Sequence, residues 1–178
     1  YKRQLLGPSG IGKTTILRTI AGLEKLKKGS IVLNGKTLSS ENINLEPEER
    51  NVSLAFQDNS LFPHYTIEKN ISLGSERNKE KKEKKISLKE IVDLLDIFHV
   101  LNKYPHEISA GEAQRASLAR SLIMQPDLLL LDEPLSNVDQ SFKEEIQVRL
   151  KKILNKLKIT TIIAVSYTHL RAHETASD

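Results

Sequence analysis

Short apolar stretches alternate with amphipathic ones along most of the chain. Four apolar runs rich in branched residues predict strands at residues 31–35, 52–56, 127–132 and 159–165. The run DLLLLD (127–132) is apolar throughout and bounded by acids, as expected of a strand buried on both faces of a sheet. The stretches between the strands have helical spacing, so the pattern predicts a largely parallel sheet covered by helices.

The helices are predicted from apolar spacing and from end signals. The helix that follows Lys13 has Ile16, Leu17, Ile20 and Ala21 on one face, and Gly22 is its expected C-cap. A second helix opens with a capping box formed by Ser87 and Glu90. Its apolar stripe is predicted to contain Leu88, Ile91, Leu94, Leu95 and Phe98.

Two further helices follow. One ends before Pro126, and the other covers residues 141–158. Residues 66–100 lack a clear strand, so a helical subdomain at about residues 60–125 is expected to be inserted into the sheet-forming domain, residues 1–165.

Composition indicates a globular domain without disulfides. Apolar residues make up 38% and charged residues 28% of the 178 positions, and no cysteine is present. No apolar run approaches the roughly 20 residues that span a bilayer. The net charge of +4 comes largely from ERNKEKKEKK (76–85), which we interpret as a solvated loop rather than a nucleic-acid patch, because glutamates are interleaved.

The segment GPSGIGKT (7–14) matches G-x-x-x-x-G-K-[ST] in full and lies between the apolar QLL and a helix. Its glycines let consecutive N–H groups point at a phosphate, and the helix start adds a positive dipole end. Lys13 would bind the outer phosphates, and Thr14 would ligate Mg²⁺. The candidate nucleotide-binding residues are Gly7, Pro8, Ser9, Gly10, Ile11, Gly12, Lys13, Thr14 and Thr15. The alternative is a glycine-rich turn that matches by chance.

The segment LLLLDEP (128–134) places two carboxylates at the carboxyl edge of the predicted sheet. Asp132 can orient Mg²⁺ through water, and Glu133 can orient the attacking water or accept its proton. Solvated acids at the end of a strand are the alternative, which the phosphate loop makes less attractive.

The segment ISAGEAQR (108–115) opens a helix, with Ser109 and Glu112 forming a capping box. It either merely starts a helix or forms a second anion site at a helix N-terminus. Because one nucleotide cannot easily use both helix starts of a chain, the second site is expected to serve a neighbouring molecule.

The order of these motifs resembles that of the nucleotide-binding subunits of ABC (ATP-binding cassette) transporters. The order is the phosphate loop, AFQ with Gln57, SAGEAQR, LLLLDEP and SNVD, over residues 1 to about 165. FQDNSLFPHYTIEKNI and the segment from YPHEIS to SNVD are similar to an importer branch that serves ferric iron, polyamines, sulfate and sugars. The resemblance implies an α/β P-loop NTPase (RecA-like) fold with a parallel-sheet core, a β-strand edge and an inserted α-helical subdomain.

The resemblance also implies roles and partners. Gln57 would contact Mg²⁺ or the attacking water, Asp132 would support Mg²⁺, and Glu133 would be the catalytic base. Ser109, Gly111 and Glu112 would face ATP bound by a second, head-to-tail subunit, and Asp139 would cross that interface. The other partners would be transmembrane permease subunits and a solute-binding protein, at the cytoplasmic face of the membrane, with no nucleic acid.

Two departures from the family pattern bear on activity. The usual signature Leu-Ser-Gly-Gly-Gln is Ile-Ser-Ala-Gly-Glu here, with Ala110 and Glu112 as the main differences. A methyl group and a negative charge near a phosphate are expected to affect the rate. The upstream aromatic residue that stacks on adenine in the family is absent, so we interpret Tyr1 as a truncation edge.

The last residues do not fit the family pattern. Ser166 occupies the Ser/Thr position before the switch histidine, but Tyr167 follows, and His169 comes two residues late, a shift of roughly 6–7 Å along a strand. VSYTHLRAHET resembles a translated sequencing adapter, so residues 166–178 are expected to be non-native. On that interpretation His169 and His173 have no role, and the native residue at 167 is histidine.

The leading prediction is therefore the ATPase subunit of an importer. A soluble cassette ATPase that acts on nucleic acid or ribosomes is the alternative, although no heptad insertion interrupts the chain. A non-catalytic ATP-binding regulator is a third possibility, against which Glu133 argues. The transported substrate is not encoded in these motifs.

Overall fold

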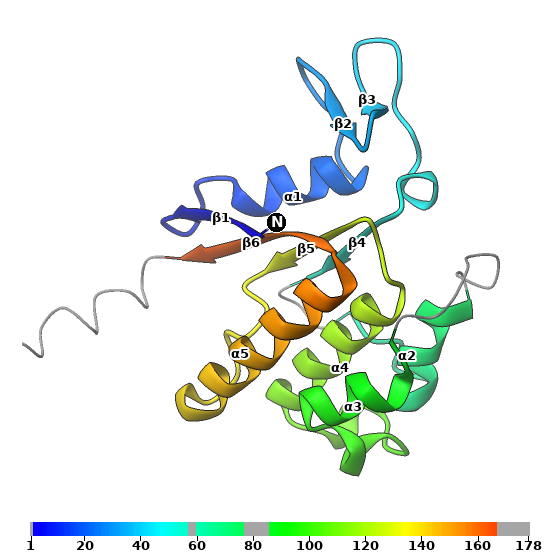
Figure 1. Ribbon diagram of the computed structural model, residues 1–178, viewed down its shortest axis with the longest axis vertical. Helices are drawn as coiled ribbons and strands as arrows, with labels where there is room; N and C mark the ends of the chain where they lie inside the picture. The colour runs from blue at the N-terminus through cyan, green and yellow to red at the C-terminus, as the bar shows by residue number, and fades with distance from the viewer. Residues whose placement is uncertain (1, 57–59, 77–85, 167–178) are drawn as a thin grey trace, which may run out of the picture.

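The centre of the structure is a parallel sheet whose strands lie in the order β1-β6-β5-β4 (Figure 1). The computed structural model describes residues 2–56, 60–76 and 86–166. Because neighbouring strands are parallel, their carboxyl ends meet at one edge, where ligands bind in open α/β sheets. The strands are β1 (Lys2–Gly7), β4 (Val52–Ala55), β5 (Leu128–Asp132) and β6 (Thr160–Ser166).

Helices cover both faces of this sheet. Leu128 and Leu130 of β5 pack with Leu17 of α1, whereas Leu129 and Leu131 belong to the larger core on the other face. Figure 1 shows α1 on one side of the sheet and the other helices on the opposite side. The burial of β5 on both faces is confirmed. The helices are α1 (Lys13–Ala21), α2 (Ile67–Glu76), α3 (Leu88–Leu95), α4 (Ala110–Ile123) and α5 (Gln140–Leu157).

The strand predicted at residues 31–35 is shorter than expected and lies outside the parallel sheet. Strand β2 (Ile31–Leu33) pairs antiparallel with β3 (Lys36–Ser39), which the sequence analysis did not predict. Asn34 and Gly35 form the turn, with φ values of 50° and 79°. Asn-Gly favours this left-handed geometry in two-residue hairpins, so the chain reverses direction here.

Most helix ends agree with the sequence prediction, but two side chains predicted to lie on apolar helix faces are exposed. Gly22 caps α1 with φ 88°, and the Ser87 capping box opens α3 as predicted. Ile16, however, is 49% exposed and Phe98 is 75% exposed. Phe98 leaves the apolar stripe because α3 ends at Leu95, and residue 96 adopts a left-handed conformation.

The helices of the middle segment pack closely on one another. An added Cβ at Gly74 of α2 would lie 2.6 Å from the Arg120 carbonyl oxygen of α4, so these helices approach without room for a side chain. A subdomain boundary near residues 60 and 125 stays a prediction.

Among the described residues, no helix is both long and apolar enough to cross a bilayer. Within the described ranges, short 3-10 helices cover Pro47–Glu49, Phe98–Val100 and Pro105–Glu107.

A buried arginine joins the end of α1 to the segment that follows the β2–β3 hairpin. Arg50 is 2% exposed, and its guanidinium donates to the carbonyls of Thr19 and Ile20 in the last turn of α1. The other acceptors are the Leu45 carbonyl, the Ser39 hydroxyl and the Asn44 side-chain oxygen. The negative end of the α1 dipole favours a cation there. Burial lowers the pKa of Arg50, and the nearby Glu46 opposes that shift.

We expect Arg50→Met to destabilise the fold by about 3 kcal/mol, because it leaves several buried acceptors without a donor. Urea unfolding followed by circular dichroism measures the change. Lys36→Met is the matched control, since the exposed Lys36 ammonium makes a single hydrogen bond within the described part of the chain, to the Glu49 carbonyl. Its replacement should change stability by less than about 0.5 kcal/mol. Equal effects of the two variants would contradict this account of Arg50.

Candidate functional site

The loop between β1 and α1 has the backbone shape of a phosphate-binding loop. Gly10 and Gly12 have φ values of 81° and 98°, a region that side chains other than glycine rarely adopt. Gly12 is the N-cap of α1, and among the described residues no side chain caps this helix start. The first N–H groups of α1 are therefore available to an anion.

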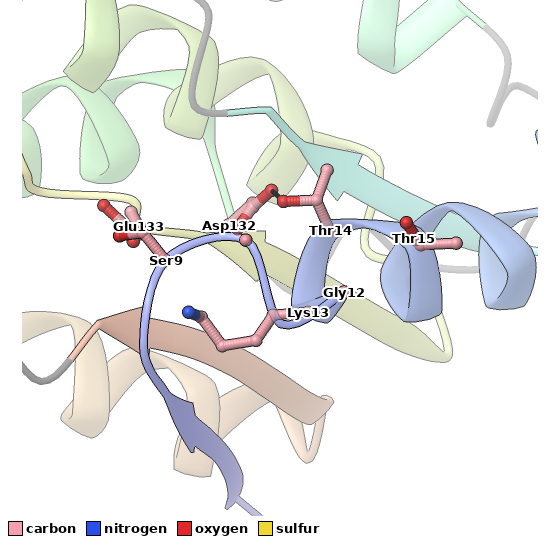
Figure 2. A pocket seen from close by; sticks show the side chains of 8 residues that line it. Ser9, Gly12, Lys13, Thr14, Thr15, Asp132 and Glu133 are labelled. Atoms are coloured by element: carbon pink, nitrogen blue, oxygen red, sulfur yellow. Dashed lines mark hydrogen bonds between the residues drawn. The ribbon is translucent and has the colours of Figure 1, made fainter.

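Lys13 lies against this loop. Its ammonium donates to the carbonyls of Gly7 and Pro8 at 2.8 and 2.9 Å, and the residue is 8% exposed. These bonds hold the charge inside the curve of the loop, as Figure 2 shows. A phosphate that enters the loop would therefore meet a cation that is already in place.

A hydrogen bond joins the start of α1 to the end of β5. The Thr14 hydroxyl donates to a carboxylate oxygen of Asp132 at 2.6 Å (Figure 2). Asp132 is 3% exposed, so its carboxylate is held in one place. A hydroxyl and a carboxylate are hard oxygen ligands of the kind that Mg²⁺ uses together with substrate phosphates. Among the described residues, no cluster of three or more His, Asp or Glu forms a self-sufficient metal site.

Glu133 follows Asp132 and has a constrained backbone. Its φ is 47°, its N–H donates to the Ala164 carbonyl, and its own carbonyl accepts from the Gln114 side chain at 3.1 Å. The residue is partly exposed and lines the same cavity as the phosphate loop. Its carboxylate is therefore accessible to a ligand in that cavity.

One cavity of about 340 Å³ brings half of the predicted site residues together. Figure 2 shows them converging from the loop, α1 and the end of β5. The lining residues are Ser9, Gly10, Gly12, Lys13, Thr14, Thr15, Asp132 and Glu133. Gly7 and Pro8 belong to the loop and hold Lys13 through their carbonyls, and Ile11 is 64% exposed beside it. Gln57, Tyr167 and His169 lie outside the described residues.

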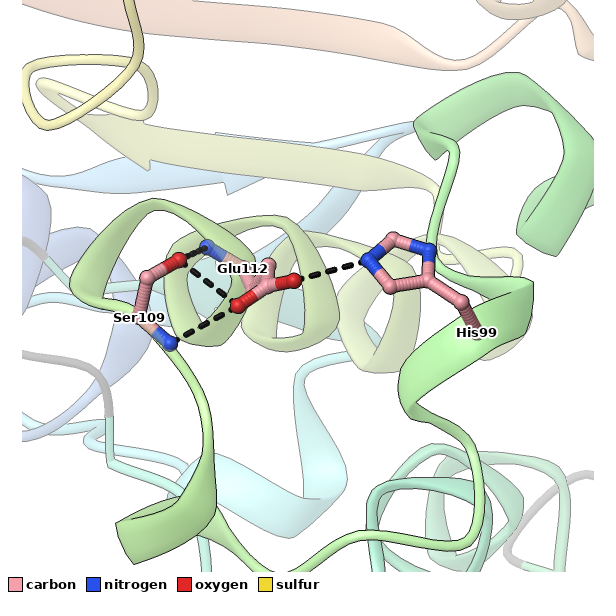
Figure 3. Close-up of polar contacts among 3 residues, drawn as sticks. All are labelled: His99, Ser109 and Glu112. Carbon is pink, nitrogen blue, oxygen red and sulfur yellow. Dashed lines mark hydrogen bonds and ion pairs between the residues drawn. The ribbon is translucent and has the colours of Figure 1, made fainter.

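The second predicted anion site is a separate feature at the start of α4. Ser109 is the N-cap, and its hydroxyl accepts from the Glu112 N–H at 3.3 Å. One carboxylate oxygen of Glu112 accepts from the Ser109 N–H and hydroxyl, and the other lies 2.7 Å from His99 Nε2 (Figure 3). Neither Ser109, Gly111 nor Glu112 lines the 340 Å³ cavity.

These contacts favour the ionised form of Glu112. The Ser109 hydroxyl, followed by the Ser109 N–H, lowers the pKa of Glu112 to about 2, and His99 adds a smaller contribution, while partial burial opposes them. The signature segment therefore has a full negative charge at neutral pH, where the family's usual glutamine has none.

Contacts that the sequence analysis missed connect α4 to the turn after β5. Gln114 is 2% exposed, and its amide bonds to Glu133, Ser136 and Asn137. An added Cβ at Gly111 would lie 2.8 Å from the Asn137 carbonyl oxygen. The only sequence signal for Gln114 was its position within SAGEAQR. Asp139 is exposed at the N-cap of α5, outside the cavity.

The low pKa of Glu112 has a consequence for acid stability. A carboxylate whose pKa falls on folding stabilises the fold fully above its ordinary pKa of 4.5, and this contribution disappears as the pH falls toward 2. Glu112→Gln should therefore destabilise the chain at pH 7 by less than about 1 kcal/mol, because the group is near the surface. That difference should vanish near pH 2.

Urea unfolding of both chains between pH 2 and 7 measures this difference. His99→Gln serves as the comparison, because the Ser109 contacts outweigh His99 in lowering the pKa of Glu112. It should leave most of the pH-dependent difference intact. A constant difference across this pH range would contradict the assigned pKa.

Comparisons with known proteins agree with the motif order and the fold. Residues 2–136 match the family described as ABC transporter. The Fe(3+) ions import ATP-binding protein FbpC of Fusobacterium nucleatum subsp. nucleatum is 42% identical over 159 residues, which are 89% of this chain and 42% of the relative. The sulfate/thiosulfate import ATP-binding protein CysA of Synechococcus elongatus is 38% identical over 173 residues, 97% of this chain and 49% of the relative.

A solved structure shares the architecture. The dimeric post-hydrolysis state of the ATP-binding cassette MJ0796 bound to ADP and Pi superposes with a TM-score of 0.75 at 26% identity, over 94% of this chain and 74% of that one. The chain spans less than half the length of the two curated relatives. The family match over residues 2–136 confirms the predicted family and the α/β fold: this chain belongs to the ABC transporter family.

Proposed function

We propose that the chain is the ATP-binding and ATP-hydrolysing subunit of an ABC importer, where it couples hydrolysis to solute transport across a membrane. The observation that carries this proposal is the single cavity in which Lys13, the Thr14–Asp132 pair and Glu133 converge on an uncapped helix start. The relatives' names support import, since they are import ATP-binding proteins for ferric ions and for sulfate or thiosulfate.

The loop and Lys13 would bind the phosphates of ATP. The N–H groups at the start of α1 donate to phosphate oxygens, and the helix dipole favours their negative charge. The Lys13 ammonium would exchange its bonds to Gly7 and Pro8 for bonds to the outer phosphates. This exchange keeps the ammonium satisfied in both states, so burying Lys13 carries little penalty before ATP arrives.

Thr14 and Asp132 would hold Mg²⁺. Their side-chain oxygens already lie side by side, joined by a hydrogen bond. When bound, Mg²⁺ would neutralise charge that develops on the phosphates. Asp132 is fixed by β5 and Thr14 by α1, so the two ligands come from rigid elements. Gln57 is proposed as a further contact on the strength of the family resemblance alone.

Glu133 would act on the attacking water. Its carboxylate orients the water and takes its proton as the oxygen bonds to the γ-phosphorus and the bond to the β-phosphate oxygen breaks, which releases ADP and phosphate. The peptide groups on both sides of Glu133 are hydrogen-bonded, so the side chain that carries the carboxylate is attached to a backbone held in place.

A second ATP-binding subunit is the proposed partner in catalysis. Ser109, Gly111 and Glu112 would face the ATP of that subunit, and Asp139 would lie at the interface; their position outside the chain's own cavity supports this role. The dimeric form of the ATP-binding cassette MJ0796 supports it as well. Permease subunits and a solute-binding protein complete the proposed importer, with the chain peripheral at the cytoplasmic membrane face.

Two substitutions separate ATP binding from hydrolysis. Lys13→Ala should weaken ATP binding at least about tenfold, since it removes the cation from the loop. Glu133→Gln should retain ATP binding but hydrolyse ATP at least about 100-fold more slowly, since it removes the proton acceptor. Equilibrium dialysis with ATP and a phosphate-release assay measure the two effects.

Lys28→Ala is the control, because Lys28 is an exposed lysine away from the cavity and its removal should affect neither step. Equal ATP affinities of the Lys13 and Lys28 variants would contradict the proposed site. Salt-sensitive binding of nucleic acid by the unaltered chain would instead favour the ATPase that acts on nucleic acid or ribosomes.

A further inference from the structure

The amide of Gln114 reaches from α4 into the turn that carries Glu133. Its nitrogen donates to the Glu133 carbonyl and the Ser136 hydroxyl, both at 3.1 Å, and its oxygen accepts from the Asn137 N–H at 3.1 Å. The side chain is 2% exposed, so water does not compete for these bonds. The Gln114 side chain thus satisfies three polar groups of the turn: one N–H donor and two oxygen acceptors.

The backbone that this amide holds is not in a relaxed conformation. Glu133 has a φ of 47°, a left-handed value that costs a non-glycine residue free energy unless its surroundings impose it. On the amino side the Glu133 N–H is held by the Ala164 carbonyl of β6. On the carbonyl side Gln114 and the Ser136 N–H hold it. Gln114 is the side-chain part of this restraint.

The first turn of α4 lies in close contact with the turn after β5 at Gly111. Gly111 lies one turn before Gln114 on α4, and an added Cβ there would come within 2.8 Å of the Asn137 carbonyl oxygen. The turn therefore rests directly on α4. A movement of the first turns of α4 would therefore also move the Glu133 peptide, to which Gln114 is hydrogen-bonded.

We propose that Gln114 is a positioning residue that sets the direction of the Glu133 carboxylate through the Glu133 backbone. It thereby ties the helix that starts at Ser109 to the hydrolytic carboxylate. The inference rests on the proposed function, in which Glu133 acts on the attacking water. Glutamine suits this position because its amide offers two N–H donors, for the Glu133 carbonyl and the Ser136 hydroxyl, and an acceptor oxygen for the Asn137 N–H.

Gln114→Leu should lower kcat for ATP about tenfold or more and leave KM within about twofold, because the reacting carboxylate is misplaced while the phosphate loop is untouched. Hydrogen exchange of the Asn137 N–H should speed up, since its acceptor is gone. Circular dichroism and thermal unfolding show whether the variant folds. Ser121→Ala is the control, because the buried Ser121 hydroxyl of α4 donates to the Ser117 carbonyl within its own helix and, among the described residues, has no bond to the turn after β5. It should change neither kcat nor Asn137 exchange.

Gln114→Glu tests the donor separately and provides a variant that retains the shape of the side chain. An ionised glutamate keeps the acceptor for Asn137 but repels the Glu133 carbonyl. Its kcat should therefore be as low as that of the leucine variant at pH 8, although Asn137 exchange stays slow. Burial raises the pKa of such a carboxyl, so lowering the pH should protonate it, restore the donor and raise kcat relative to the unaltered chain.

Three results would overturn the inference. They are a kcat for Gln114→Leu equal to that of Ser121→Ala, unchanged exchange at Asn137, or no recovery of Gln114→Glu at low pH. Absence of ATP turnover by the unaltered chain would instead refute the proposed function and with it the catalytic part of the inference. The exchange measurement would then still show whether Gln114 holds the turn.

Discussion

The hydrogen bond between the Thr14 hydroxyl and the Asp132 carboxylate joins segments that are 118 residues apart in sequence. The parallel sheet makes this contact possible, since β1 and β5 both pair with β6 and end at the same edge. The phosphate loop, the oxygen donors and Glu133 are placed by these pairings. A shift of β5 by one residue would turn the Asp132 side chain to the other face of the sheet and separate it from Thr14.

The glycines and Glu133 make opposite use of left-handed backbone. At Gly10 and Gly12 the positive φ values cost little, and they give the loop the curved shape that the proposed phosphate site requires. At Glu133 the same region is costly and is maintained by hydrogen bonds from β6 and α4. The loop is thus shaped by its own residues, whereas the carboxylate depends on its neighbours.

The sequence was informative wherever an apolar pattern or an end signal decides structure. The both-face burial of β5, the Gly22 cap and the capping boxes at Ser87 and Ser109 were all predicted and are confirmed. One error arose where a pattern continued past a helix end: Phe98 fits the spacing of α3, but the helix ends at Leu95. Spacing alone does not encode where a helix ends.

A second group of misses consists of buried polar side chains. Arg50, Asn70 and Gln114 are at most 2% exposed, yet a polar residue in a sequence pattern predicts a surface position. Each is buried because it satisfies backbone groups of a segment distant from its own, or of a loop: Arg50 at the end of α1, Asn70 at residues 62–66, and Gln114 at the turn after β5. Those partners are known only once the fold brings them together.

The start of α4 sets a requirement for any role of Ser109 in binding phosphate. A serine hydroxyl has one proton, and here it is donated to Glu112 at 2.7 Å. To donate to a phosphate, the hydroxyl must leave that carboxylate, which the Ser109 N–H and His99 would continue to hold. The glutamine that is usual in the family would compete for this proton as a neutral acceptor, which is weaker than a carboxylate. If Ser109 binds a phosphate as proposed, Glu112 would thus raise the free energy needed for the hydroxyl to reorient, while the Ser109 N–H and the contact with His99 Nε2 keep the carboxylate in place.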